Sequence, residues 1–391
     1  MEFVARQSAL LRELNLIQGV VEKKNTVPIL ANVLLSASTD VVEVMATDLE
    51  VSVRSSLTAG VTRPGALSVS ARKLHEIVRA LPDSEVEIKS DGDNWATITC
   101  ERSHFRLMGL PKDDFPTLMS PGKGDKVTFG VQQFREMVQK VIFAVTVDDA
   151  RFALNGALMV LEKGTICLVA SDGHRLAYVA RPVEGGRPVD RDIRVVIPHK
   201  ALGELLRIAE EIGGEIVFSR QENQIFFEMG RCTLSSRLLE GQFPNYEKVL
   251  PKGNDKVIEL DRTAFFDAVR RISLIANERN RAVKVSLAKG RLEISSKNPE
   301  LGEARENVSV DYGGGEVEIG FNAKYLMDFL GVVESETVVF ELKDEATQGL
   351  LRPGRNGAAA KQVKSKGAAK DGNGAAQGGG EYKYVVMPMR I

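Results

Sequence analysis

Ser171, Asp172 and His174 are the residues whose types and spacing best suit chemistry in this chain. A serine, an aspartate and a histidine are the groups of a hydrolytic triad, and Asp172 with His174 would suit a hydrolase or a nuclease. The same segment is also a turn, because Asp-Gly is a turn dipeptide and here it stands between two apolar runs.

The chain repeats one sequence pattern three times. The segments that correspond to 171–174 in the two other copies are 47–50 and 297–300, and neither contains a histidine. This comparison favours the turn, and a hydrolase or nuclease using Asp172 and His174 stays as the alternative. The chain also has no Walker A, GxGxxG, GxSxG or HExxH motif. The sequence therefore predicts a non-catalytic protein that needs no cofactor.

An amphipathic helix opener occurs three times, at 11–14, 134–137 and 266–269. Apolar residues of the first copy recur at spacings of four, three and four, which places them on one face of a helix: Leu10, Leu14, Ile17 and Val21. Ser8, just before them, is expected to cap this helix.

A strand that runs into a second helix also occurs three times, at 69–74, 197–202 and 321–326. Each copy has a capping residue or a proline at the helix start: Ser70, Pro198 and Asn322. Each copy has a cation in the first helical turn: Arg72, Lys200 and Lys324. A cation there opposes the helix dipole, so its recurrence predicts contact with a row of phosphates.

Alternating segments between the helices, at 97–100, 105–108, 225–227 and 338–340, are typical of strands. The fold class is therefore α+β: three repeated domains, each with two helices and antiparallel sheets. Linkers rich in Gly, Pro and Lys place the domains at 1–122, 127–252 and 256–391.

Composition narrows the class of protein further. The 391 residues carry a formal net charge of −1, which excludes a chain that is basic throughout but does not exclude DNA. No apolar run approaches ~18 residues, so a membrane span is not expected. Cys100, Cys167 and Cys232 are unpaired in spacing and suit a reducing, cytoplasmic setting, and the four histidines show no metal-ligand spacing.

Geometry suggests that the repeats close into a ring. Six helices lining a hole would leave it roughly 9 Å wide, and twelve would leave roughly 28 Å, using ~10 Å between helix axes. Only the larger hole admits a DNA duplex. A ring around DNA would therefore need two copies of the chain.

The three-repeat pattern, TVPILAN at 26–32, SDGHRL at 171–176 and VVMPMRI at 385–391 together resemble the bacterial DNA polymerase III beta subunit family, the sliding clamps. The resemblance covers the chain except 353–380. It implies three DNA-clamp domains, a head-to-tail dimeric ring around duplex DNA, no sequence specificity, and tethering of the replicative polymerase for processive synthesis.

The resemblance also implies a cleft between the second and third domains that docks short, mostly apolar peptides. Its lining would comprise Arg151, Leu154, Ser171, Gly173, His174, Arg175, Leu176, Pro244, Lys248, Val249, Val386, Met387, Pro388, Met389, Arg390 and Ile391. Methionines suit such a site because their flexible side chains accept varied ligands, although Met387 and Met389 could equally belong to a core strand.

For DNA, the matching residues are Lys24, Arg72, Lys73 and Lys200, to which the repeat adds Lys324. The chain departs from the family at Asp148, Asp149 and Ala153, and at His199, whose contribution would depend on pH. For the dimer interface, the matching apolar residues are Phe105, Leu274 and Ile275. A charged rim would place Lys73 and Arg102 opposite these acids: Glu300, Glu303 and Glu306.

The implied partners are double-stranded DNA, a second copy of the chain, the DNA polymerase III alpha subunit, the clamp loader, and other polymerases or repair proteins with short linear peptides. No membrane partner is implied. The segment 353–380, rich in Gly, Ala and Lys, is unusual for the family and is expected to be a disordered insertion. It is either a solvated loop or a cationic tether that adds a salt-dependent hold on DNA or an acidic partner.

Overall fold

The computed structural model describes residues 1–21, 27–90, 93–122, 126–147, 152–183, 192–354 and 380–390. They form two compact units, one mainly Met1–Arg135 with Lys200–Leu238 and the other mainly Glu136–Val183 with Leu239–Ile391. The middle repeat therefore contributes to both units, because its two halves extend the sheets of different neighbours.

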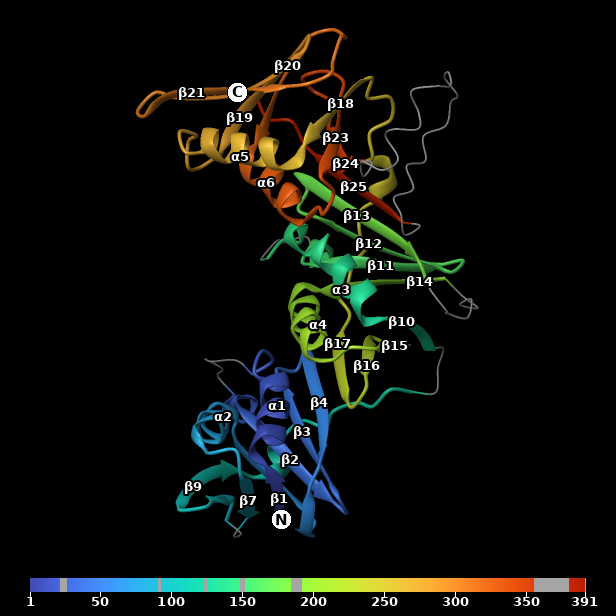
Figure 1. Cartoon of the computed structure of the whole chain (residues 1–391). Coiled ribbons are helices and arrows are strands. Elements are labelled where there is room, and N and C mark those ends of the chain that lie inside the picture. The colour runs from blue at the N-terminus through green and yellow to red at the C-terminus, as the bar shows by residue number, and fades with distance from the viewer. Residues whose placement is uncertain are drawn as a thin grey trace. The chain divides into compact units, whose positions relative to one another are not determined.

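Each repeat consists of two halves with the order strand, helix and three strands (Figure 1). The halves of the first repeat are β1 (Glu2–Arg6), α1 (Gln7–Ile17), β2 (Asn32–Ser38), β3 (Val41–Thr47), β4 (Val51–Thr58), and β6 (Gly65–Ser70), α2 (Ala71–Ala80), β7 (Glu85–Ser90), β8 (Trp95–Cys100), β9 (Ser103–Leu110). A short strand, β5 (Gly60–Arg63), pairs with β1. The second repeat has β10 (Lys126–Gly130), α3 (Val131–Gln139), β11 (Gly156–Glu162), β12 (Thr165–Ser171), β13 (Arg175–Pro182), and β14 (Ile193–Pro198), α4 (His199–Glu211), β15 (Glu215–Gln221), β16 (Gln224–Met229), β17 (Cys232–Arg237).

The third repeat has β18 (Lys256–Asp261), α5 (Arg262–Ser273), β19 (Ala282–Ala288), β20 (Arg291–Asn298), β21 (Gly302–Ser309), and β22 (Val317–Asn322), α6 (Ala323–Val332), β23 (Thr337–Leu342), β24 (Gly349–Pro353), β25 (Glu381–Val386). The prediction of two helices and antiparallel strands in every repeat is thus confirmed, including the four strand segments chosen from their alternation.

Sheets continue from one repeat into the next through antiparallel strand pairs. β4 of the first repeat pairs with β17 of the second inside a 13-stranded sheet. β13 of the second repeat pairs with β25 of the third inside an 8-stranded sheet. The remaining 4-stranded sheet, β21-β20-β19-β22, ends at β21.

The helix faces follow the predicted periodicity, with one correction at a helix start. Leu10, Leu14 and Ile17 are fully buried on α1, whereas Val21 lies beyond the helix end. Ser8 is not the cap, because the helix already begins at Gln7, directly after β1, and no side chain caps it. The predicted caps of α2 and α6 are confirmed, since Ser70 accepts from Lys73 N and Asn322 from Lys324 N. Pro198 ends β14 immediately before α4.

The three cysteines are buried and free, as their apolar surroundings predicted. No helix within the described ranges is long and apolar enough to cross a membrane. Most of the segment 353–380 lies outside the described residues, so the expectation that it is disordered concerns residues that the structure does not describe. The strands on either side of it do pair, with Leu350 opposite Val385, so the segment joins two neighbouring strands of one hairpin.

Candidate functional site

The segment 171–175 is a tight turn between β12 and β13. Oδ1 of Asp172 accepts the backbone N–H groups of His174 and Arg175, both at 2.9 Å. Oγ of Ser171 accepts the N–H of Gly173 at 3.1 Å and donates to the carbonyl of Arg175 at 2.7 Å. Gly173 has φ +86°, which a glycine adopts without strain. These residues are therefore held by the turn itself, as the turn interpretation expects.

The hydrolase alternative is not favoured by this geometry. What Asp172 accepts from His174 is the backbone N–H, and its second oxygen, Oδ2, accepts from Nε of Arg175 at 2.9 Å. A triad aspartate would instead orient the histidine ring.

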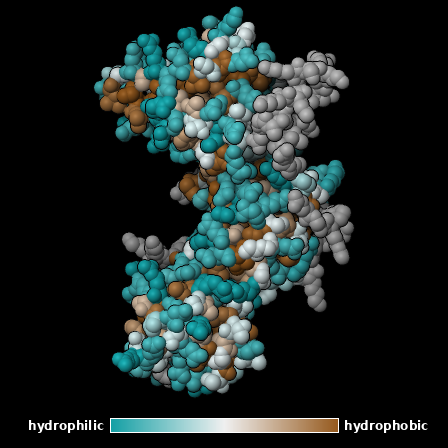
Figure 2. Space-filling view, viewed as in Figure 1, coloured by the Kyte–Doolittle hydropathy of each residue, from teal (hydrophilic) through white to brown (hydrophobic). Residues whose placement is uncertain are grey.

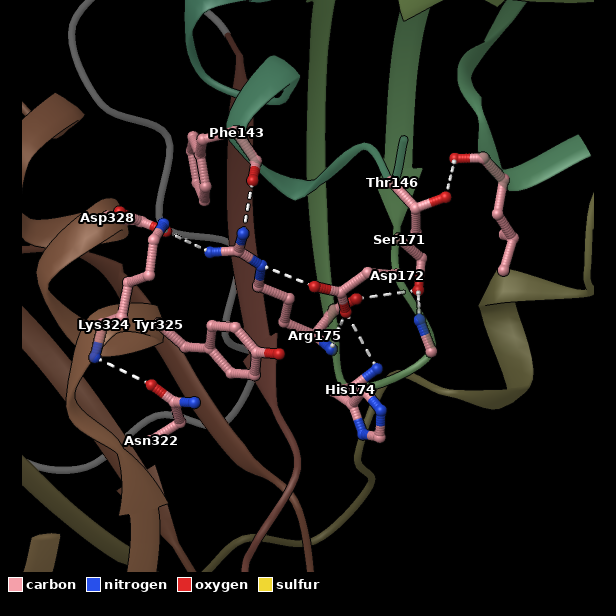
Figure 3. Close-up of polar contacts among 12 residues, drawn as sticks. Phe143, Thr146, Ser171, Asp172, His174, Arg175, Asn322, Lys324, Tyr325 and Asp328 are labelled. Atoms are coloured by element: carbon pink, nitrogen blue, oxygen red, sulfur yellow. Dashed lines mark hydrogen bonds and ion pairs between the residues drawn. The ribbon is translucent and has the colours of Figure 1, made fainter. Parts of the chain in front are cut away.

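Arg175 was expected to line a ligand cleft, but its side chain is buried, with 6% of its surface exposed. Nη1 donates to Oδ2 of Asp328 and Nη2 to the carbonyl of Phe143, both at 2.5 Å (Figure 3). The guanidinium lies 4.4 Å from the ring centroid of Tyr325 and 5.4 Å from that of Phe143. Arg175 therefore joins its turn to α6 and to the short helix Ile142–Ala144.

The C-terminal segment runs beside this turn. Met387 N donates to the carbonyl of His174 at 2.9 Å, directly after Arg175 pairs with Val386 in the sheet. Met389 N donates to the carbonyl of Gly320 at 2.8 Å, which attaches the segment to β22. The methionines are half-buried rather than part of a fully buried strand, so they stay available to a ligand.

An apolar cluster lies beneath the turn and the C-terminal strand. Leu176 and Val385 are buried in it with Tyr246, and Val249 packs against them. The rings of Tyr178 and Tyr246 lie 5.9 Å apart. Burial raises the pKa of the Cys167 thiol in this cluster to about 12, so it stays protonated.

The structure divides the predicted cleft residues into two groups. Buried ones form the support: Leu154, Arg175, Leu176 and Val386. Exposed or half-buried ones form the surface: Ser171, Gly173, His174, Pro244, Lys248, Val249, Met387, Pro388, Met389 and Arg390. Arg151 and Ile391 lie outside the described residues.

The three recurrent first-turn cations each pair with a carboxylate. Nε of Arg72 lies 2.7 Å from Oε1 of Glu76, and Nζ of Lys73 lies 2.8 Å from Oε2 of the same residue. Hydrogen bonds from Lys73 and then Arg72 lower the pKa of Glu76 to about 2. Lys200 pairs with Asp48.

Lys324 lies 2.7 Å from Oδ2 of Asp328, the oxygen that also accepts from Arg175. Burial lowers the pKa of His199, so its ring is neutral at pH 7. Ala153 is buried, while Lys24, Asp148 and Asp149 lie outside the described residues.

Apolar side chains are exposed near two strand edges. Phe105 on β9 is 37% exposed and Leu274, after α5, is 76% exposed, with Ile275 half-buried beside it. Met108 and Leu301, which sequence reasoning did not select, are also exposed at these edges. Figure 2 shows hydrophobic surface where α5 ends and the β20–β21 turn lies. Glu306, expected in a charged rim, pairs with Arg271 of its own chain at 2.6 Å.

The pairing of these edges is one-sided within the described residues. β21 pairs with β20 alone, and residues 103–108 of β9 pair with β8 alone. Free strand edges that carry exposed apolar residues are suited to pair with another chain.

Comparisons with known proteins cover the whole chain. Family models match residues 1–119 (DNA polymerase III beta subunit, N-terminal domain), 128–245 (central domain) and 247–365 (C-terminal domain). The beta sliding clamp of Pseudomonas putida is 36% identical and that of Escherichia coli K12 is 30% identical, each with both chains fully covered. The crystal structure of the DNA polymerase III subunit beta from Pseudomonas aeruginosa has a TM-score of 0.90 at 35% identity, again covering both chains fully. Clamps from that organism and from Bartonella birtlesii have also been solved bound to griselimycin, with TM-scores of 0.89 and 0.88.

Proposed function

The chain belongs to the DNA polymerase III beta subunit family, and from this premise we propose how its residues carry out the work of a sliding clamp. A sliding clamp is a non-catalytic processivity factor: it encircles duplex DNA without sequence specificity and tethers the polymerase. The protein accordingly acts in DNA replication by holding other molecules in place, and we propose that it does so in the cytoplasm. The proposed repeat boundaries are 1–122, 127–252 and 256–391.

The ring in this proposal is a head-to-tail homodimer closed by β21 of one copy and β9 of the other. The single observation that carries it is the repetition of strand pairs: β4 with β17, then β13 with β25. β21 follows the same strands in the third repeat as β4 and β13 do in the first two, and β9 corresponds to β17 and β25. Two copies would pair both free edges and leave none.

The internal junctions also give a register for the proposed contact. Val53 pairs with Leu234 and Ala177 pairs with Tyr384. Ala304 corresponds to Val53 and Ala177. Each directly follows the residue that pairs, across the hairpin turn, with the residue just before the Asp or Asn of that turn: Ser52 with Thr47, Leu176 with Ser171 and Glu303 with Lys297. Phe105 corresponds to Leu234, because each lies two residues after the first residue of its strand, Ser103 or Cys232.

With this register, Ala304 would lie opposite Phe105 of a second copy. Phe105 would then face the exposed Leu274 and the adjacent Ile275, which supports their assignment to an apolar interface. Glu306 would lie opposite Ser103, one residue from Arg102, consistent with a charged rim that also includes Lys73, Glu300 and Glu303.

For DNA, the proposal assigns electrostatic backbone contacts to Arg72, Lys73, Lys200 and Lys324, with Lys24 outside the described residues. All four described cations lie in the first turn of a helix, and their carboxylate partners hold them in place until phosphates compete for them. Such contacts read the phosphate backbone and not the base sequence, which a sliding protein requires.

For partners, the proposal places a peptide-binding cleft at the turn 171–176, the linker residues Pro244, Lys248 and Val249, and the segment 386–390. Half-buried methionines support it, because they follow Val385 of the buried apolar cluster in the chain. Griselimycin, which binds relatives, would bind here, as would peptides of the DNA polymerase III alpha subunit, the clamp loader and other polymerases or repair proteins.

Solution mass, combined with retention on DNA circles, tests the ring. We expect a mass near twice 42.8 kDa by light scattering and retention on nicked circular DNA that is lost when the circle is cut. Leu274→Asp should give a monomer that neither circular nor linear DNA retains. Met119→Asp, at an exposed apolar residue outside the proposed interface, should behave as the wild type. A wild-type monomer that binds circles and linear DNA alike would mean ordinary electrostatic contact and would exclude the ring.

A further inference from the structure

Arg175 has the contacts of a structural residue rather than of a ligand contact. Each of its three guanidinium nitrogens donates a hydrogen bond inside the protein, to Asp172, Asp328 and the carbonyl of Phe143. Tyr325 lies against the guanidinium plane. A buried cation with these bonds has little of its charge left for a bound peptide.

The residues that Arg175 contacts belong to different repeats. Asp172 lies in its own turn and Phe143 in the same repeat, whereas Asp328 lies on α6 of the third repeat. The backbone of Arg175 also pairs with Val386. One residue thus contacts both repeats that contribute the cleft surface (Figure 3).

The exposed residues of the cleft depend on these bonds. His174 is fixed through its N–H by Asp172, whose other oxygen Arg175 holds. Met387 is fixed by the carbonyl of His174. A shift of Arg175 relative to Asp328 would therefore move His174 and Met387, the residues expected to meet the ligand.

We infer that Arg175 and Asp328 are a positioning pair that sets the geometry of the peptide-binding cleft across two repeats, with the guanidinium of Arg175 bonded to the protein and not to the peptide. The inference rests on the proposed docking function. Removing Asp328 leaves the buried guanidinium of Arg175 without one of its acceptors, and removing Arg175 breaks the contact between the turn and α6. Positional errors of about 1 Å in a binding site greatly reduce its affinity. Removing the second partner then adds little, because the constraint is already gone.

Affinity for fluorescently labelled griselimycin, measured by anisotropy on the full-length dimer, tests the pair. Arg175→Ala and Asp328→Asn should each weaken binding at least 10-fold, and the double variant should bind no more weakly than the worse single variant. Lys126→Ala is the control, because it removes an ion pair with Glu228 in the other compact unit and should change affinity less than twofold. Losses that multiply, or unchanged affinity in Asp328→Asn, would overturn the inference.

Amide hydrogen exchange of the unliganded protein gives a second readout, independent of any ligand. Asp328→Asn should speed exchange at His174, Arg175 and Met387 at least 10-fold and leave the β19–β20 hairpin unchanged. Exchange that rises everywhere would indicate general destabilisation and contradict a positioning role. If Asp328→Asn shows this local effect but the wild-type protein binds no griselimycin, the docking proposal fails while the positioning of the turn stands.

Discussion

Asp48 and Asp172 hold the same turn in two repeats. Oδ1 of Asp48 accepts the N–H groups of Glu50 and Val51 at 2.9 and 2.6 Å, as Oδ1 of Asp172 accepts those of His174 and Arg175. Asn298 takes a reduced form of this role in the third repeat, accepting one N–H, that of Glu300, at 3.0 Å. The carboxylate beside His174 is thus a repeated structural element.

A first prediction follows for stability. Asp172→Ala should destabilise the protein by about 3 kcal/mol, because two backbone donors and the buried Arg175 lose their acceptor. Asn298→Ala should cost about 1 kcal/mol, since one backbone bond is lost. Thermal unfolding followed by circular dichroism would rank them. Equal melting temperatures for the two variants would contradict the structural role given to Asp172.

A second prediction concerns the cleft surface. His174→Ala should weaken griselimycin binding about 10-fold, equivalent to about 1.4 kcal/mol of lost contact, without changing the mass of the dimer. Lys289→Ala, at an exposed turn of the third repeat, should leave the affinity unchanged. Titration by anisotropy measures both, and a His174→Ala variant with wild-type affinity would remove this residue from the proposed site.

A third prediction tests the strand register between two copies. The register that pairs Ala304 with Phe105 also pairs Arg305 with His104, and three flanking residues are exposed: Arg305, His104 and Arg106. Cysteines at Arg305 and His104 should form a disulfide-linked dimer under mild oxidation, because paired residues on neighbouring strands bring their Cβ atoms within about 5.5 Å.

Cysteines at Arg305 and Arg106 provide the matched control, since they lie on the same face but two residues out of register. Non-reducing gel electrophoresis should show far less linked dimer for this pair. If the second pair linked better than the first, the register would be wrong by two residues even if the ring were right.

A fourth prediction concerns DNA contact and charge. Glu76 occupies both Arg72 and Lys73, so Glu76→Gln should free two cations for phosphates. The plot of log affinity for a short duplex against log salt should then steepen by up to about 0.9 per freed cation. Glu318→Gln serves as the control, because it frees Lys284, which is not among the proposed DNA contacts, and should leave this slope unchanged.

The pKa of Glu76 sets the pH range over which this residue pairs with Arg72 and Lys73. Its pKa is lowered to about 2 from 4.5, so the stabilising ion pairs are fully present above about 4.5 and are lost as the pH falls toward 2. An NMR titration of the carboxyl group should show this low midpoint, and Arg72→Ala should raise it. A midpoint near 4.5 in the wild type would mean that the pairs do not form in solution.

The sequence predicted the repeats, the two helices in each, and the turn at 171–175, because these follow from local periodicity and from turn residues. It also selected Phe105 and Leu274, whose exposure is now seen. It misassigned Ser8, because β1 runs into α1 without a gap and leaves no position for a separate cap.

The sequence could not show that Arg175 is buried. Its main acceptor, Asp328, lies 153 residues away on another repeat, and Phe143 contributes a backbone carbonyl that no side-chain pattern reveals. Lys324 and Asp328, four residues apart on one helix, offered the only local sign of that carboxylate. Contacts between repeats therefore had to come from the three-dimensional structure.

The pairing of β24 with β25 has a practical consequence for work with this protein. The chain leaves the sheet after Pro353 and returns at Glu381, on strands that already lie side by side. The cost of closing such a connection rises only slowly with its length. A fluorescent domain or an affinity tag could replace the segment between these strands, and would mark the clamp without using either terminus.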